Sequence, residues 1–135
     1  MIEYRDGYKY QLAKDFSVKT KITPAEPISS KYIRLDTEGN LFIREGYAWD
    51  GPSGPAIDTK NFMRGSLVHD ALYQLMREGY MSEETWRDDA DDALYDIVRE
   101  DGMSWLRAWY VYRGVRWFGG PSADARYERG IQTAP

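Results

Sequence analysis

The feature that most constrains the fold is a change of residue pattern near the middle of the chain. Residues 1–49 contain short segments in which apolar and polar residues alternate, as they do in strands with one buried face. Residues 62–118 instead carry apolar residues at helical spacing. This order predicts an α+β fold, with an N-terminal antiparallel β-sheet and its hairpins packed on a three-helix C-terminal half.

The strongest strand pattern covers residues 16–22, where every second residue is suited to a buried face: Phe16, Val18, Thr20 and Ile22. Further strands are predicted at residues 8–12, 32–35 and 41–44. The last two flank a turn at residues 36–40, where Gly39 and Asn40 tolerate positive φ angles. Residues 23–27 contain two prolines and are predicted to be a loop.

Helices are predicted at residues 62–78, 83–101 and 104–118, to within a few residues at each end. Gly79 is the expected C-terminal cap of the first helix, and Ser82 is the expected N-cap of the second. The glycines and prolines of residues 50–61 predict a loop before the helices. We expect residues 1–120 to form one domain and residues 121–135 to form a surface arm or tail.

The chain has 135 residues, no cysteine and a net charge of −4. A chain of about 100–150 residues suits one domain with its own core. The lack of cysteine excludes a disulfide scaffold, a cysteine-based zinc site and a cysteine nucleophile. Weak acidity argues against nucleic acid as a partner, because non-specific binding needs a basic surface. The sequence also predicts no signal peptide and no transmembrane segment.

His69 is the single histidine, and Tyr73 lies four residues later on the same face of the predicted helix. Asp70 points about 100° away from His69 around that helix. Asp91, on the next helix, lies about as far after the turn at residues 79–80 as His69 lies before it. An antiparallel helix pair would therefore bring His69 and Asp91 face to face. The neighbouring acids are expected on a solvated face: Asp88, Asp89, Asp92 and Asp96.

Two interpretations of these residues stay open. His69 could be a half-buried side chain that locks the helix pair through a carboxylate. Alternatively, it could belong to a site together with Asp91 and with Asp50, which opens the glycine- and proline-rich loop. A site requires the imidazole at the floor of an open pocket with Asp50 and Asp70 converging on it.

These residues resemble an uncharacterised family of domains of unknown function that is frequent in tailed bacteriophages, prophages and bacteria. The shared pattern is D-G-x-S-x-P at residues 50–55, H-D-x-L-Y at residues 69–73 and A-D at residues 90–91. The resemblance implies a phage-type protein of the host cytoplasm or the virion. Virion or tail proteins are then the implied partners.

The H-D-x-x-Y motif is also similar to the signature of secreted calcium-dependent phospholipases. That similarity implies His69 as the base that activates water, Asp91 as the acid that orients it, and Asp70 as a calcium ligand. The loop at Asp50 and Gly51 would supply a further carboxylate and backbone carbonyls to calcium. Tyr73 completes the implied catalytic set. The helix-clamping cysteines and the glycine-rich calcium loop of those enzymes are absent.

Two functions follow from these interpretations. The first is a small hydrolase of an ester or cell-envelope component, with a lipid among the implied substrates. The second is a non-enzymatic virion or tail protein, in which the His–Asp cluster only locks the helices. The third predicted helix is aromatic, with Trp105, Trp109, Tyr110, Tyr112, Trp117 and Phe118. Such a stripe usually packs into a core, and a surface for lipid or a partner is the alternative; Arg107, Arg113 and Arg116 are expected on a solvated face.

Overall fold

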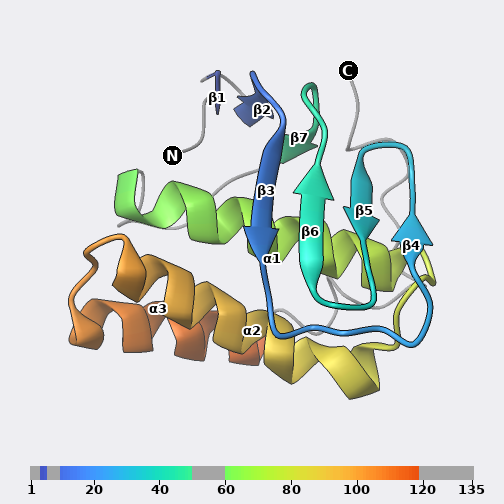
Figure 1. Ribbon diagram of the computed structural model, residues 1–135. Helices are drawn as coiled ribbons and strands as arrows, with labels where there is room; N and C mark the ends of the chain where they lie inside the picture. Colours follow the sequence, from blue (N-terminus) through green and yellow to red (C-terminus); the bar gives the residue numbers. More distant parts are fainter. Residues whose placement is uncertain (1–3, 6–9, 50–59, 119–135) are drawn as a thin grey trace. The chain divides into compact units, whose positions relative to one another are not determined.

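The computed structural model describes residues 4–5, 10–49 and 60–118 (Figure 1). Contacts divide the chain into two compact units, of which the first holds the described strands and the second holds the described helices. The α+β class is therefore confirmed, with antiparallel strands followed by helices. The predicted loop at residues 50–59 and the predicted arm at residues 121–135 lie outside the described residues.

The described strands form two antiparallel sheets. One sheet has the order β1–β2–β7 and the other has the order β3–β6–β5–β4. Their bounds are β1 (Tyr4–Arg5), β2 (Tyr10–Leu12), β3 (Phe16–Lys19), β4 (Ile28–Ser29), β5 (Ile33–Leu35), β6 (Asn40–Ile43) and β7 (Ala48–Trp49). Three of these were not predicted, namely β1, β4 and β7, because strands of two residues are too short to show an alternating pattern.

The four-stranded sheet confirms the predicted alternation. In β3, Phe16 is paired with Ile43 and Val18 with Leu41, so these residues share one face. The burial pattern continues past the strand, with Thr20 buried and Lys21 exposed. The strand itself ends at Lys19, three residues earlier than predicted. The Thr20 hydroxyl explains this end, because it donates to a backbone carbonyl and accepts a backbone N–H in place of ladder bonds.

The turn between β5 and β6 lies at the predicted residues. Asp36 Oδ1 accepts hydrogen bonds from the backbone N–H groups of Glu38 and Asn40, both at 2.9 Å. Gly39 has a φ of +93°, and a Cβ atom there would lie 2.2 Å from the carbonyl oxygen of Thr20. This turn therefore requires glycine for its backbone conformation and for its close approach to the end of β3.

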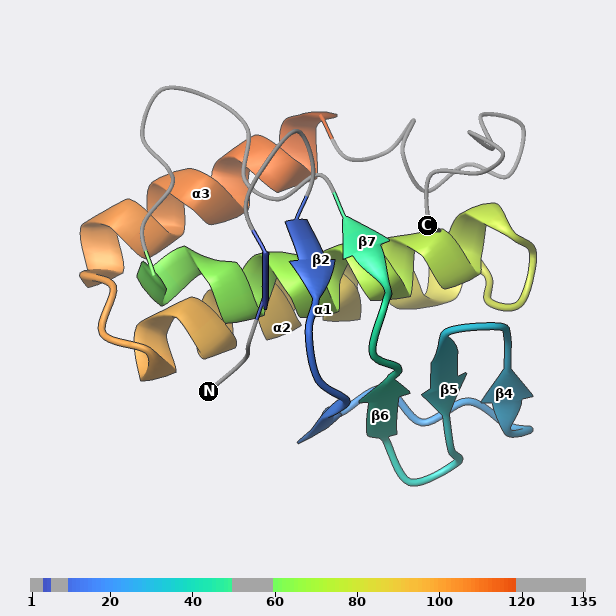
Figure 2. The same cartoon turned by 90° about the horizontal axis from the view of Figure 1, so that it is seen from above.

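The helical unit contains α1 (Lys60–Arg77), α2 (Glu83–Glu100) and α3 (Trp105–Phe118). Figures 1 and 2 show α2 running back along α1, and α3 returning along α2. The predicted caps are confirmed, since Ser82 accepts a hydrogen bond from the backbone of Thr85 and Gly79 donates to the carbonyl of Met76. The start of α1 is two residues earlier than predicted, so Lys60 and Asn61 are helical rather than part of the loop.

The core between α2 and α3 is formed by small and aliphatic side chains of α3. Ala108 and Val111 pack in one buried cluster with Leu94 and Val98 of α2. The prediction that the aromatic stripe of α3 is core is wrong for three of its members, which are exposed: Trp105, Trp109 and Tyr110. The core-facing side is the opposite one, where only short side chains fit between closely packed helices.

Candidate functional site

The α1–α2 pair brings the predicted histidine and carboxylate together. His69 Nε2 lies 2.7 Å from Asp91 Oδ1. Asp91 has no exposed surface, and His69 is 7% exposed. The prediction that these residues face each other across the helix pair is confirmed.

Gly65 allows α1 and α2 to approach closely beside this contact. A Cβ atom at Gly65 would lie 2.7 Å from Val98 Cγ1 and 2.9 Å from Leu94 Cδ1. Gly65 precedes His69 by one turn of α1, and Leu94 follows Asp91 by about one turn of α2. The small residue therefore sets the helix separation at which the imidazole reaches the carboxylate.

Tyr73 joins the same carboxylate oxygen. Its hydroxyl donates to Asp91 Oδ1 at 2.6 Å, and its ring centroid lies 4.1 Å from that of His69. The four-residue spacing predicted that Tyr73 and His69 share a face. It did not predict that both would reach one acceptor atom, because that depends on the position of α2.

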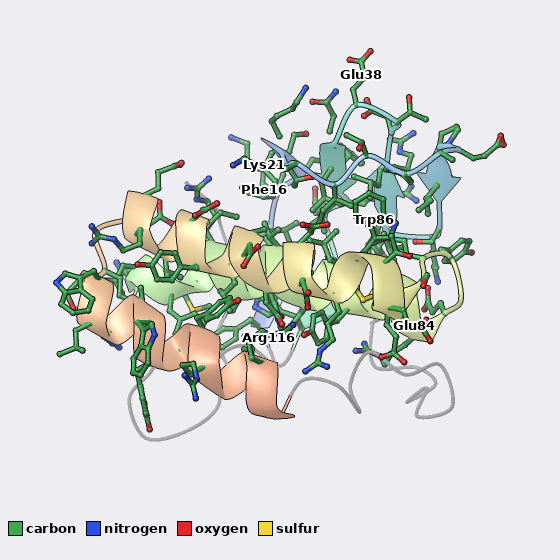
Figure 3. The ribbon with its side chains drawn as sticks, turned by 90° about the horizontal axis from the view of Figure 1, so that it is seen from below. Phe16, Lys21, Glu38, Glu84, Trp86 and Arg116 are labelled. Carbon is green, nitrogen blue, oxygen red and sulfur yellow. The ribbon has the colours of Figure 1, made fainter. Side chains whose placement is uncertain are left out.

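Arg116 of α3, labelled in Figure 3, also contacts Asp91. Its Nη1 donates to Asp91 Oδ2 at 3.1 Å and also bonds to Asp88. Arg87 of α2 adds a donor to the Tyr73 hydroxyl at 3.4 Å and another to the backbone carbonyl of Arg116. The expectation that Arg116 lies on a purely solvated face is wrong. The pattern of α3 alone could not reveal this contact, because the contact depends on where α3 packs against α2.

Asp91 is thus a buried carboxylate with donors from two other helices. Burial favours the protonated form, but the hydrogen bonds from His69, Tyr73 and Arg116 outweigh it and lower the pKa of Asp91 below its ordinary value. Burial and the neighbouring Asp91 charge raise the pKa of the Tyr73 hydroxyl. The cluster therefore contains an ionised carboxylate and a protonated phenol at neutral pH.

His69 faces two acids. Burial would lower its pKa, but Asp70 and Asp91 together raise the pKa above the ordinary value of histidine. Asp70 Oδ1 lies 3.8 Å from Nδ1, and the Asp70 side chain is 33% exposed. When the ring is neutral, the Asp91 contact favours the proton on Nε2, so that Nδ1 carries the free electron pair.

The imidazole is buried among the described residues. The His69 side chain is only 9% exposed, so the described part of the chain does not show the open pocket that was predicted around it. Asp50, the acid expected at the mouth of the site, lies outside the described residues.

Only one of the implied calcium ligands lies in the described part of the chain. Asp70 is described, whereas Asp50 and Gly51 are not. Within residues 4–5, 10–49 and 60–118, no three histidine, cysteine, aspartate or glutamate side chains gather in a group that could hold a metal ion. The described residues alone therefore do not fit a calcium site, and Asp70 is placed to act on His69 instead.

A hollow of about 390 Å³ lies on the four-stranded sheet, in the other unit. Lys19, Arg34 and Phe42 are among its lining residues, with the Arg34 guanidinium 4.6 Å from the centre of the Phe42 ring. Its single acid, Asp36, is bonded into the β5–β6 turn. This hollow contains no histidine, so the His–Asp pair of α1 and α2 is the better candidate for acid–base chemistry.

The fold and the site together define an α+β protein with a buried His–Asp–Tyr cluster between two antiparallel helices. The chain belongs to a family of proteins of unknown function, DUF1353, whose model matches residues 28–115. The match includes His69, Tyr73 and Asp91 but ends one residue before Arg116. No curated protein and no solved structure matches the chain. The resemblance to an uncharacterised family is thus confirmed. None of the helices in the described residues is both long and apolar enough to cross a membrane.

Proposed function

We propose that this protein is a hydrolase in which His69 activates water for attack on an ester. One observation carries the proposal: His69 Nε2 lies 2.7 Å from Asp91 Oδ1, and the Tyr73 hydroxyl bonds to the same oxygen. A carboxylate in this position holds the ring in one orientation and one tautomer, as a general base requires. The arrangement also agrees with what the phospholipase-like motif implies for these three residues.

In the proposed reaction, the water oxygen attacks the ester carbonyl carbon while Nδ1 of neutral His69 takes a water proton. The imidazolium that forms lies between Asp91 and Asp70, whose charges stabilise it. It then gives its proton to the leaving alcohol oxygen as the carbon–oxygen bond breaks. The products are an acid and an alcohol, and His69 returns to its neutral form.

Arg116 supplies a positive charge that balances the negative charge of Asp91. It pairs with Asp91, so the buried carboxylate does not depend on a permanently protonated histidine for a counter-charge. Without Arg116, the pKa of His69 would rise further, and less of the histidine would be in the base form at neutral pH. We therefore assign Arg116 a positioning and charge-balancing role.

The phospholipase-like motif favours a lipid or other cell-envelope ester as substrate. Calcium enters the proposal only through that motif, which implies Asp70, Asp50 and Gly51 as its ligands. The water-activating step as written needs His69, Asp91 and water alone. A calcium titration followed by thermal unfolding tests the ion separately, because a ligand that binds only the folded protein raises its melting temperature.

The complete burial of Asp91 favours a second candidate function. Asp91 has no exposed surface and accepts hydrogen bonds from α1 and α3, so it ties three helices together. On this alternative the cluster is only a lock, and the protein is a structural or interaction component. A phage virion or tail protein is the form of this alternative that we propose.

His69→Gln separates the two functions, because glutamine can still donate to Asp91 but cannot act as a base. The assay uses p-nitrophenyl esters and phospholipid vesicles as substrates, and circular dichroism gives the melting temperature. For a hydrolase we expect activity in the wild type, at least a hundredfold loss in His69→Gln and only a small change in melting temperature. Asp96→Asn, which replaces an exposed acid of α2, is the matched control and should keep full activity.

Wild-type protein that hydrolyses none of these esters, with or without calcium, would contradict the first function. Full activity in His69→Gln would contradict the assigned base. A large fall in melting temperature together with absent wild-type activity would instead support the structural lock.

A further inference from the structure

The outer face of α3 is apolar although it is exposed. Trp105 is 63% exposed, Leu106 60%, Trp109 47% and Tyr110 64%. At 100° per residue these positions span about 140° of the helix circumference. Ala108 and Val111, which are buried in the core, lie on the opposite side. The four large side chains therefore form one continuous outward surface, which we call the α3 aromatic face.

The charges of α3 differ from those of the rest of the helical unit. Residues 105–118 contain three arginines, Arg107, Arg113 and Arg116, and no acidic residue. By contrast, α2 contains eight acidic residues and two arginines. The Arg113 guanidinium lies 5.3 Å from the centre of the Trp109 ring, within the α3 aromatic face. This basic, aromatic surface thus belongs to a protein whose net charge is −4.

We propose that the α3 aromatic face docks onto the surface of an anionic phospholipid bilayer. Tryptophan and tyrosine favour the boundary between headgroups and acyl chains, where an apolar ring can be buried while its polar edge stays hydrated. Arginine beside them is attracted to anionic headgroups. With 14 residues, α3 is too short to span a bilayer, so it lies in the plane of the interface.

The charge distribution favours a membrane over a second copy of the chain. In a twofold contact of this face with itself, each copy would contribute the arginines of α3 and no acidic residue of that helix, so like charges would meet. An anionic bilayer instead presents charges opposite in sign to those of α3. It also repels the acidic residues of α2, so it favours contact through α3.

This inference does not depend on catalysis, because docking is measured without turnover. If the proposed hydrolase also acts on lipid esters, the same face would hold the enzyme at its substrate. Failure of docking and failure of hydrolysis are separately visible, since soluble p-nitrophenyl esters report on His69 alone.

The experiment is co-sedimentation of the full chain with vesicles of phosphatidylcholine alone and of phosphatidylcholine with phosphatidylglycerol, at low and at physiological salt. We expect partition to the anionic vesicles that weakens with salt and is much weaker on neutral vesicles. Trp105→Ser/Trp109→Ser should reduce partition at least about tenfold, since both rings lose their burial in lipid. Arg113→Gln should reduce it about fivefold on anionic vesicles only.

Tyr80→Ser is the matched control, because Tyr80 is also exposed, at 48%, but lies in the turn between α1 and α2. It should bind vesicles as the wild type does. Folded wild-type protein that does not bind anionic vesicles would overturn the proposal, as would unchanged binding by Trp105→Ser/Trp109→Ser. A concentration-dependent dimer in analytical ultracentrifugation, abolished by the same double substitution, would assign the face to a second copy instead.

Discussion

The α1–α2 interface and the outer face of α3 depart from the usual distribution of residues in opposite ways. The interface buries a carboxylate, an imidazole and a phenol, whereas α3 exposes two tryptophans, a leucine and a tyrosine. Buried charges are rare unless they are paired, and large exposed apolar patches commonly mark binding surfaces. Each feature costs free energy that an ordinary side-chain arrangement would avoid.

The two features differ in whether contacts among the described residues compensate for this free-energy cost. At the interface, every oxygen of Asp91 has a donor, so burial is compensated locally. On α3 the described residues leave the aromatic surface to solvent. We infer that the first feature works within the chain and that the second is completed by something outside it. The following predictions test this contrast, from the largest expected effect to the smallest.

The largest effect is expected for Asp91→Ala. The substitution leaves three buried or half-buried donors without their acceptor, including the imidazole and the Arg116 guanidinium. Breaking a buried ion pair from one side costs about 3–5 kcal/mol in the free energy of unfolding. Urea denaturation followed by circular dichroism measures this loss. A change below about 1 kcal/mol, the range of surface pairs, would show that the cluster contributes little to the fold.

Gly65→Ala is expected to have the next largest effect. The added methyl would lie 2.7 Å from Val98 Cγ1, so α1 and α2 must separate or the neighbouring side chains must shift. Overpacking of this kind costs about 1–3 kcal/mol. The same denaturation experiment measures it, and NMR should show changed His69 ring shifts because the helix separation sets the contact with Asp91. Gly114→Ala is the control, since a Cβ atom there meets no neighbour within 4 Å.

The pH dependence tests the charge state of the same interface. Asp70 and Asp91 raise the pKa of His69, so the stabilisation from its protonated form is complete below about pH 6.5 and is lost as the pH rises through the raised pKa. The free energy of unfolding of the wild type, minus that of His69→Gln, should therefore fall as the pH rises. Hydrolysis should change in the opposite direction, because the base form of His69 appears over the same pH range. A difference that increases with pH would contradict the raised pKa.

The sequence predicted the features that depend on nearby residues or on a short turn, and it missed those that depend on how separate helices pack. Strand alternation in β3 and the caps at Gly79 and Ser82 are local and were predicted. The register of the α1–α2 hairpin was also predicted, because a short turn joins the two helices. The hairpin register also placed His69 opposite Asp91. The Arg116 contact was missed, because it joins residues on separate helices whose packing angle no local pattern specifies.

The orientation of α3 likewise could not be predicted from the sequence of that helix alone. Its aromatic residues are the strongest hydrophobic signal in that helix, and they predicted a core-facing stripe. The structure instead places Ala108 and Val111 in the core. Helical spacing identifies which residues share a face, but the neighbouring helix decides which face is buried. Here α2 presents Leu94 and Val98, against which small side chains allow close packing.

The smallest effect is expected for Trp105→Ser/Trp109→Ser on the stability of the isolated protein. Because both side chains are about half exposed or more, at 63% and 47%, their truncation should change the free energy of unfolding by little. Surface substitutions of this kind usually stay within about 0.5 kcal/mol. A double variant that keeps wild-type stability but no longer binds vesicles would show that these rings contribute to membrane binding and not to the stability of the fold. A loss of several kcal/mol would instead show that the α3 aromatic face packs within the chain, and the contrast with the Asp91 cluster would disappear.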